Sequence, residues 1–426
     1  MIFLKETYFS NKQLILSFLY NIGINLTGFG LKFLAFFNEK IKKGVVGRRN
    51  LFSILEKNLN EQDKTLWFHC ASLGEYEQGL PVFKELRELY PNHKIVLSFF
   101  SPSGYDIRKN SPVADIVIYI PLDTKKNAKR FISILKPELS IFVKYDIWPN
   151  LLNELKARNL RAILISAVFR EKQPYFKFYG QQLRDALFSF EHIFTQNEHS
   201  KTLLKSINYN NVTVSGDTRF DRVYSQLQQD NNLNFIDSFK DNKLCIVAGS
   251  TWPEGEKLIT AYINSFKDKD VKFIIAPHNI KDAQIKNLSE KLEVSTVLYS
   301  NKDTANLSTA KVFIIDTIGI LSKIYNYADI AYIGGALGNT GLHNTLEAAV
   351  FSVPIIIGNH YEKFPEAHAL IESGGTFSIS NQNEFNLILN KLIDESDFKT
   401  DCGSKNFEYV NKNRGAVIQI LDYLRI

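Results

Sequence analysis

The sequence predicts an α/β protein of two Rossmann-like, doubly wound domains, preceded by a hydrophobic N-terminal helix. Its 426 residues are too many for one domain, because domains average about 150 residues. Its composition, 45% hydrophobic and 23% charged, is typical of a globular chain with a large core. After residue 49, short β-branched and aromatic runs alternate with amphipathic helical stretches, and this alternation pauses at 216–242 and then resumes. The pattern predicts two parallel sheets, each covered by helices on both faces.

The first expected element is a hydrophobic helix within the segment 1–49. Residues 13–31 carry no formal charge, and this stretch approaches the roughly 20 residues that a bilayer-spanning helix needs. However, Ser17, Asn21 and Asn25 recur every four residues and form a polar stripe. A stripe favours a helix that lies in the membrane interface or docks on its own domain. We therefore expect a membrane anchor, with a spanning helix and an ordinary core helix as alternatives. The basic residues of its flank are Lys40, Lys42, Lys43, Arg48 and Arg49.

The charge is unevenly distributed along the chain. Residues 1–213 carry 30 Lys and Arg against 19 Asp and Glu, a net charge of +11 within a total of +6. A basic first half favours an anionic membrane or lipid as partner. Nucleic acid is not expected, because no zinc-finger, RNP or basic-zipper signature occurs. Three widely separated cysteines exclude a disulfide framework and favour a reducing compartment.

Residues 50–215 are expected to form the first α/β domain. Seven strand-like runs alternate with helical stretches, which is typical of a doubly wound sheet. The expected strands are 66–71, 95–100, 116–120, 139–143, 162–166, 192–195 and 212–215. The clearest expected helices are 80–90, 128–135, 151–158 and 175–188.

Residues 216–242, rich in Gln, Asn and Asp, are expected to form a polar linker before a second domain. That second domain spans 243–426 and ends in a C-terminal helix. Its expected strands are 244–248, 273–276, 294–298, 312–315, 330–333, 354–357 and 376–379. Ligands of doubly wound sheets bind beyond the carboxyl ends of the strands, so we expect a cleft where the two sheets present these ends to each other.

Glu75 is the first candidate catalytic residue. It follows the first expected strand within the sequence SLGE and opens a helix. The helix dipole favours the ionised carboxylate, which is the form that accepts a proton from a hydroxyl nucleophile. Taken alone, a glutamate that merely compensates the dipole is the more common interpretation.

Two further loops carry chemistry-bearing residues. Asp146 leaves the fourth expected strand just before Trp148, where a Trp-Pro pair opens a helix. Its alternative is a proline-started helix with the tryptophan in the core. Arg219 lies at the domain junction, where it could hold a phosphate. An ion pair of Arg219 with Asp217 or Asp221 is the interpretation that its isolated motif favours.

The second domain offers polar groups at several strand ends. Ser250 and Thr251 follow its first strand, where hydroxyl and amide groups can take a phosphate. A glycine-rich loop at 334–341 precedes His343 and Glu347, whose spacing places them on one side of a helix. The loop is neither a dinucleotide fingerprint nor a Walker loop. The sequence therefore indicates a nucleotide-sugar or phosphate site at this end of the domain.

These segments, in this order, resemble the 3-deoxy-D-manno-octulosonic acid (Kdo) transferases of lipopolysaccharide assembly. The resemblance covers essentially the whole chain and is strongest at residues 72–75, 148–150, 216–221, 249–251 and 341–347. It implies a GT-B glycosyltransferase that moves Kdo from CMP-Kdo to the lipid A precursor lipid IVA. It also implies an acceptor domain first, a donor domain second, no metal, no cofactor, and a location on the cytoplasmic face of the inner membrane.

The resemblance also implies roles for individual residues. Glu75 matches the general base, Asp146 an acidic residue before Trp-Pro, and Arg219 a transition-state-stabilising lysine. The positions implied for CMP-Kdo binding are Pro277, His278, Ile318, Gly319, Ile320, Asn344, Thr345, Leu346 and Glu347, together with Ser250 and Thr251.

The chain departs from the family pattern at three places. Lys144 replaces an acidic residue, Leu342 replaces a glycine, and Pro277-His278-Asn279 stands in place of Arg-His-Pro. The first departure leaves the second acidic role to Asp146. Two alternatives stay open: another GT-B enzyme that uses UDP-sugars, either a transferase or an epimerase, and a non-catalytic lipid-binding or scaffold protein.

Overall fold

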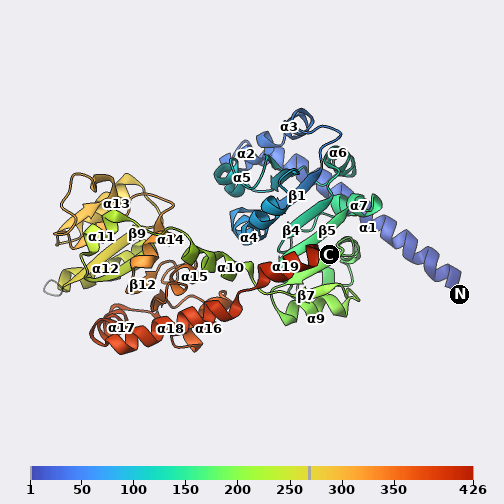
Figure 1. The fold of residues 1–426 in the computed structure, drawn as a ribbon. Helices are drawn as coiled ribbons and strands as arrows, with labels where there is room; N and C mark the ends of the chain where they lie inside the picture. Colours follow the sequence, from blue (N-terminus) through green and yellow to red (C-terminus); the bar gives the residue numbers. More distant parts are fainter. Residues whose placement is uncertain (1, 267–269, 426) are drawn as a thin grey trace. The chain divides into compact units, whose positions relative to one another are not determined.

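The computed structural model describes residues 2–266 and 270–425, with side chains from residue 17 onward (Figure 1). Residues 1, 267–269 and 426, which belong to the expected anchor and second domain, lie outside the described residues. The chain divides into two compact units. Unit 1 contains the chain up to Asp221 together with the residues from Gly415 onward, and unit 2 contains Arg222–Arg414.

Unit 1 is built on a seven-stranded sheet in the order β3-β2-β1-β4-β5-β6-β7. All of its paired strands are parallel, which confirms the predicted doubly wound sheet. The strands are β1 (Thr65–Cys70), β2 (Lys94–Phe99), β3 (Ile116–Tyr119), β4 (Leu139–Val143), β5 (Arg161–Ala167), β6 (His192–Thr195) and β7 (Val212–Val214). Each lies within a few residues of its predicted range.

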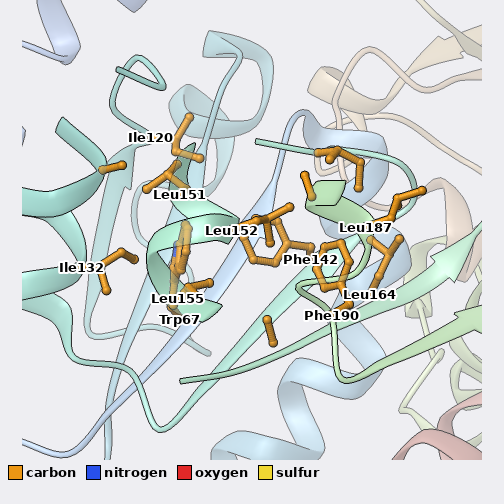
Figure 2. Packing of buried hydrophobic residues seen from close by; sticks show 14 of the residues in the cluster. Trp67, Ile120, Ile132, Phe142, Leu151, Leu152, Leu155, Leu164, Leu187 and Phe190 are labelled. Carbon is orange, nitrogen blue, oxygen red and sulfur yellow. The ribbon is translucent and has the colours of Figure 1, made fainter. Parts of the chain in front are cut away.

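Helices cover both faces of this sheet, so successive side chains of β1 are buried on opposite sides. Trp67 packs with Leu151 and Leu155 in one hydrophobic cluster, and Phe68 packs in the other (Figure 2). The helices are α1 (Ile2–Leu34), α2 (Glu39–Gly47), α3 (Leu51–Asn58), α4 (Leu73–Leu89), α5 (Pro102–Arg108), α6 (Lys125–Leu135), α7 (Pro149–Ala157), η1 (Pro174–Phe176), α8 (Gln181–Leu187), α9 (Glu198–Ser206), α10 (Thr218–Tyr224, which crosses into unit 2) and α19 (Ala416–Leu424).

Unit 2 contains a second parallel, seven-stranded sheet in the order β10-β11-β9-β8-β12-β13-β14. Its strands are β8 (Leu244–Thr251), β9 (Val271–Pro277), β10 (Thr296–Leu298), β11 (Val312–Ile314), β12 (Ile330–Ile333), β13 (Ile355–Gly358) and β14 (Thr376–Ile379). Its helices are η2 (Ser225–Gln228), α11 (Asn234–Lys240), α12 (Pro253–Ser265), α13 (Asp282–Glu290), η3 (Tyr299–Asn301), α14 (Leu321–Ile324), η4 (Tyr325–Tyr327), α15 (Leu346–Ala349), α16 (Pro365–Glu372), α17 (Gln382–Asp394) and α18 (Ser396–Asn413).

Two predicted segments differ from the structure. The helix expected at 175–188 is two pieces, η1 and α8, because the backbone at Lys177 is extended and Gly180 lies against the carbonyl of Pro174. The expected linker at 216–242 contains helices, and Ile236 and Phe239 of α11 are completely buried. These two apolar side chains are part of the hydrophobic core, although the segment around them is mostly polar in composition.

The C-terminal helix belongs to unit 1, whereas the sequence assigned it to the second domain. Helix α19 is drawn in red in Figure 1. Its residues Ile420 and Leu424 belong to the same hydrophobic cluster as Phe68 of β1. The Asp221 carboxylate caps this helix by accepting the amide hydrogens of Gly415 and Ala416 at 2.8 and 3.1 Å. This cap gives Asp221 a structural role rather than an ion pair with Arg219.

Helix α1 docks on unit 1 through its polar side. The Tyr20 hydroxyl donates to Asp123 Oδ2 at 2.7 Å, and Asn150 Nδ2 donates to Asn21 Oδ1 at 3.1 Å. Asp123 is completely buried, and it also accepts the amide hydrogens of Asn150 and Leu151 at the start of α7. Helix α1 is therefore tied to the buried N-terminus of α7.

The opposite side of α1 is apolar and exposed. Phe29 and Phe33 are 69% and 65% exposed, and Phe36 just beyond the helix is 84% exposed. Within the described part of the chain, no helix is long and apolar enough to cross a membrane. An ordinary core helix does not fit these exposures, because its apolar side would be covered.

Two basic residues that follow α1 contact groups of unit 1. Arg48 points inward, since its guanidinium donates to the carbonyls of Phe100 and Ile120 at 2.7 and 2.9 Å, and burial lowers its pKa to about 10. Lys43 forms an ion pair with Asp106 at 3.1 Å. Arg48 is thus a structural residue rather than a headgroup-level charge.

Tyr20→Phe should destabilise the protein by about 1.5–3 kcal/mol, because a buried carboxylate loses a hydrogen-bond donor. Urea unfolding measures this change, with Tyr179→Phe as the control, since Tyr179 is 55% exposed. Equal stability of the two variants would contradict the docking of α1 on Asp123.

Candidate functional site

Glu75 lies in the first turn of α4, directly after β1. Its Oε2 accepts the amide hydrogen of Ser72, the N-cap residue, at 3.1 Å. This is the local geometry of a capping glutamate, and it orients the carboxylate toward the carboxyl end of the sheet. Only 8% of Glu75 is exposed, which is unusual for a residue that merely compensates a helix dipole.

The surroundings of Glu75 raise its pKa. Burial is the largest cause, followed by the negative charge of Asp146, while His69, the Ala71 backbone and Lys144 act in the opposite direction. The helix dipole was expected to favour the ionised carboxylate, but burial and Asp146 outweigh the groups that favour ionisation. A raised pKa makes the carboxylate a stronger base, which suits proton abstraction from a hydroxyl.

Asp146 is held by two residues that the sequence analysis did not assign to the site. Its Oδ2 lies 2.5 Å from His69 Nε2 and 2.9 Å from Trp148 Nε1. His69 is completely buried in β1, and its Nδ1 lies 2.8 Å from Ser98 Oγ. The available sequence signal was a histidine inside an otherwise apolar strand. Trp148 therefore binds Asp146 through its indole nitrogen as well as packing in the core.

Lys144 adopts a left-handed backbone conformation, with φ of 74°, at the end of β4. Strained backbone of this kind is concentrated at functional sites. The lysine lowers the pKa of Glu75, so this departure from the family pattern places a positive charge near the carboxylates.

Arg219 forms an ion pair with Asp217 in unit 1. Its Nε and Nη2 lie 2.8 Å from Asp217 Oδ2, and its amide donates to Asp217 Oδ1 at 2.9 Å. The side chain is 30% exposed. This geometry is the ion pair that the isolated motif favoured, and it holds the guanidinium in a fixed orientation.

Unit 2 presents a stack of three aromatic rings at the end of β8. Trp252 stacks on His278 with ring centroids 4.6 Å apart, and His278 lies 4.6 Å from His343. Trp252 Nε1 donates to His343 Nε2 at 3.0 Å. Burial and the neighbouring His278 lower the pKa of His343 to about 4, so this imidazole is neutral near pH 7. His278 is one of the predicted site residues, whereas Trp252 is not.

Glu347 and Asn344 form a linked pair at the start of α15. Asn344 Nδ2 donates to Glu347 Oε1 at 3.0 Å, and Asn344 Oδ1 accepts the Leu346 amide at 3.2 Å. The predicted i,i+4 relation between His343 and Glu347 does not hold, because α15 begins only at Leu346. Arg222 Nη2 lies 3.9 Å from Glu347 Oε1, so the carboxylate faces a cation.

The other predicted binding residues have unequal access to a ligand. Thr345 and Leu346 are 1% and 0% exposed, so their side chains serve packing. Ile318 is 78% exposed on the loop that continues through Gly319 and Ile320 before α14. The other predicted residues lie at strand ends: Ser250, with φ of 51°, and Thr251 at the end of β8, and Pro277 at the end of β9.

The glycine-rich loop brings its own backbone close together. Gly335 has φ of 106°, and a Cβ there would lie 1.9 Å from the carbonyl oxygen of Gly341. Only glycine fits this position, so the loop places His343 beside Trp252 without steric conflict.

Comparison with solved structures supports the fold class. The crystal structure of UDP-GlcNAc 2-epimerase from Neisseria meningitidis bound to UDP-GlcNAc matches 85% of this chain and 100% of its own, with a TM-score of 0.59 and 15% identity. A glycosyltransferase from Rickettsia africae matches 85% of this chain and 98% of its own, with a TM-score of 0.55 and 14% identity. These likenesses confirm the predicted GT-B type of fold.

Sequence comparison relates the chain to one family of transferases. The family model for 3-deoxy-D-manno-octulosonic-acid transferase matches residues 47–222. The 3-deoxy-D-manno-octulosonic acid transferase of Haemophilus influenzae is 26% identical over 84% of this chain and 86% of its own length. A bifunctional glycosyltransferase/methyltransferase of Fusobacterium nucleatum is 27% identical over 91% of this chain, which spans 60% of that longer protein. The chain is therefore similar to the 3-deoxy-D-manno-octulosonic acid transferases, and its residues 47–222 match the model of that family.

Proposed function

We propose that this protein transfers Kdo from CMP-Kdo to the lipid A precursor lipid IVA. The observation that carries the proposal is the buried Glu75 carboxylate, whose pKa is raised by burial and by Asp146, within the region that matches the family model. A buried, basic carboxylate at the end of a sheet is suited to activate a hydroxyl group.

In the proposed reaction, Glu75 takes the proton of the acceptor hydroxyl. The hydroxyl oxygen then forms a bond to the anomeric carbon of Kdo, while the bond from that carbon to the CMP phosphate breaks and CMP leaves with the electron pair. A single displacement of this kind inverts the anomeric centre and needs no metal. Arg219, held by Asp217, is proposed to stabilise the developing negative charge.

Unit 2 is proposed to bind the CMP-Kdo donor. The rings of Trp252, His278 and His343 offer a flat aromatic surface, and Glu347 offers a carboxylate suited to sugar hydroxyls. His343 contributes no charge near neutral pH, since burial and His278 lower its pKa to about 4. The site is therefore suited to bind a nucleotide by stacking and by neutral hydrogen bonds.

The N-terminal helix is proposed to hold the enzyme on the cytoplasmic face of the inner membrane. Its polar side is occupied by contacts to unit 1, which leaves its phenylalanine side exposed. An amphipathic helix with this arrangement lies in the interface plane rather than across the bilayer. The hydroxyl and phosphate groups of lipid IVA also lie in the membrane interface, where basic residues of unit 1 can bind them.

Product analysis tests the proposed function. Purified protein, incubated with CMP-Kdo and lipid IVA in detergent, should release CMP and give lipid products that carry added Kdo by mass spectrometry. Consumption of UDP-sugars in place of CMP-Kdo would instead support the UDP-sugar alternative. Absence of both reactions under these conditions would contradict the transferase assignment.

Glu347→Ala should weaken CMP binding by about 1–3 kcal/mol, because Asn344 and Arg222 lose their shared partner and the ligand loses an acceptor. Isothermal calorimetry with CMP measures the change. Glu372→Ala, which removes an exposed carboxylate from α16, is the matched control. An unchanged dissociation constant for Glu347→Ala would return this residue to a purely structural role.

A further inference from the structure

His69 belongs to a continuous hydrogen-bonded chain of five side chains, which we call the His69 chain. His69 Nε2 lies 2.5 Å from Asp146 Oδ2, and Nδ1 lies 2.8 Å from Ser98 Oγ. At one end of the chain, Trp67 Nε1 donates to Ser98 Oγ at 2.8 Å. At the other end, Trp148 Nε1 donates to Asp146 Oδ2 at 2.9 Å. Two strands, β1 and β2, and the loop between β4 and α7 contribute to the chain.

The Asp146 carboxylate assigns a hydrogen to one ring nitrogen of His69. An ionised carboxylate can only accept, so the 2.5 Å contact places a hydrogen on Nε2, and His69 donates to Asp146. The other ring nitrogen, Nδ1, lies 2.8 Å from Ser98 Oγ and 3.1 Å from the Ser98 carbonyl oxygen, and these contacts hold the ring in place. Trp148 Nε1 lies 3.0 Å from His69 Nε2 and 2.9 Å from Asp146 Oδ2, so its hydrogen is directed at the same carboxylate oxygen.

Two N–H donors, His69 and Trp148, thus converge on one oxygen of Asp146. The donors come from β1 and from the loop before α7, so the carboxylate is fixed with respect to both elements. Asp146 is 18% exposed, whereas His69 is completely buried. The histidine side chain is therefore placed to act through Asp146 rather than on a substrate.

We propose that His69 is a positioning residue of the transfer reaction, which holds the Asp146 carboxylate beside Glu75 through its Nε2–H. This proposal rests on the proposed function and adds to it a group that touches no substrate. The charge of Asp146 acts on Glu75 only while its carboxylate keeps this orientation. Loss of the Nε2 donor should therefore change the basicity of Glu75, although Glu75 itself is not substituted.

Two substitutions at His69 distinguish a role as hydrogen-bond donor from a role in packing alone. His69→Met fills a similar volume without a donor and should lower kcat by about 10–100-fold, as loss of a supporting hydrogen bond does. His69→Gln, whose amide can donate to Asp146, should recover at least part of the activity. Both should bind CMP like the wild type. The apparent pKa of the acidic limb of the kcat/KM profile should change in His69→Met, and it should change less in His69→Gln.

Equal losses in the two variants, with an unmoved pH profile, would overturn the proposal. Wild-type turnover in His69→Met would overturn it as well. Should both variants fail to fold, Ser98→Ala provides the second test, because it removes the hydroxyl that contacts Nδ1 and helps to hold the ring. Its matched control is Ser140→Ala in β4, a buried serine whose hydroxyl has no hydrogen-bond partner within residues 2–266 and 270–425.

Nitrogen-15 NMR of protein labelled at its eight histidines reads the tautomer without any turnover. We expect a His69 ring that carries a hydrogen on Nε2 in the wild type and in Ser140→Ala, and a shifted Nδ1 resonance in Ser98→Ala, which lacks the Ser98 hydroxyl. Protonation on Nδ1 alone in the wild type would overturn the proposal. A wild-type protein that transfers nothing from CMP-Kdo overturns the proposed function instead, and the tautomer result distinguishes the two failures.

Discussion

Glu75→Gln is expected to lower kcat/KM by about 10²–10⁴-fold, the typical contribution of a general base. The glutamine side chain keeps an oxygen that can accept the Ser72 amide hydrogen, so the start of α4 is preserved. Initial rates with CMP-Kdo and lipid IVA measure the loss, and CMP affinity should not change. Glu85→Gln, an exposed position on the same helix, is the control. Turnover within about threefold of the wild type would leave Glu75 as a helix cap only.

The same substitution should leave the protein as stable as the wild type or more stable. Burial and Asp146 raise the pKa of Glu75 in the folded state above its unfolded value. The stability linked to this group is therefore fully present below the unfolded pKa and is lost as pH rises through the folded pKa. Near pH 7 the wild type carries the cost of a buried charge that Glu75→Gln lacks. Thermal unfolding measured from acidic to neutral pH should show the variant gaining relative to the wild type as pH rises.

The pH dependence of activity follows from the same shift. Because Glu75 must be ionised to accept a proton, kcat/KM should rise with pH through an apparent pKa above the ordinary value of a glutamate. A profile that stays flat from pH 5 to neutrality would contradict this assignment of the base.

Phe29→Ser combined with Phe33→Ser is expected to weaken binding to vesicles by about 100-fold or more, since burial of each phenylalanine contributes about 1.5–3 kcal/mol. Both side chains are exposed on the side of α1 opposite Tyr20, so the docking of the helix on unit 1 should persist. Sedimentation with vesicles that contain anionic phospholipid measures the partition. CMP binding should be unchanged, because the proposed donor site is in unit 2.

The matched control for this variant is Leu387→Ser combined with Ile418→Ser, two residues that are 72% and 63% exposed on other helices. Equal vesicle binding by both double variants and the wild type would refute the anchor. Point substitutions are preferable to deletion of residues 1–40, because deletion would also remove Tyr20 from the buried carboxylate of Asp123. High salt should release part of the wild type, since each basic residue near an anionic surface contributes about 1 kcal/mol and is screened.

The local pattern of the sequence was sufficient to predict most of the fold. Both seven-stranded sheets, their parallel pairing and the helix that opens at Glu75 follow from hydrophobic alternation and from residues at strand ends. Local pattern failed where a polar composition concealed buried residues such as Phe239, and where α19 returns to unit 1. Those errors concern which core an amphipathic helix joins, and periodicity carries no information about that choice.

The partners of buried polar groups were decided only by the tertiary structure. The sequence alone determined that Glu75 follows a strand and begins a helix, because both features depend on neighbouring residues. His69 meets Ser98, Asp146 and Trp148, which are 29, 77 and 79 residues away in the chain. Strand β1 lies between β2 and β4 in a fixed register, and this order brings those groups to one end of the sheet. A buried polar side chain must satisfy its hydrogen bonds there, so strand order and register determine its chemistry.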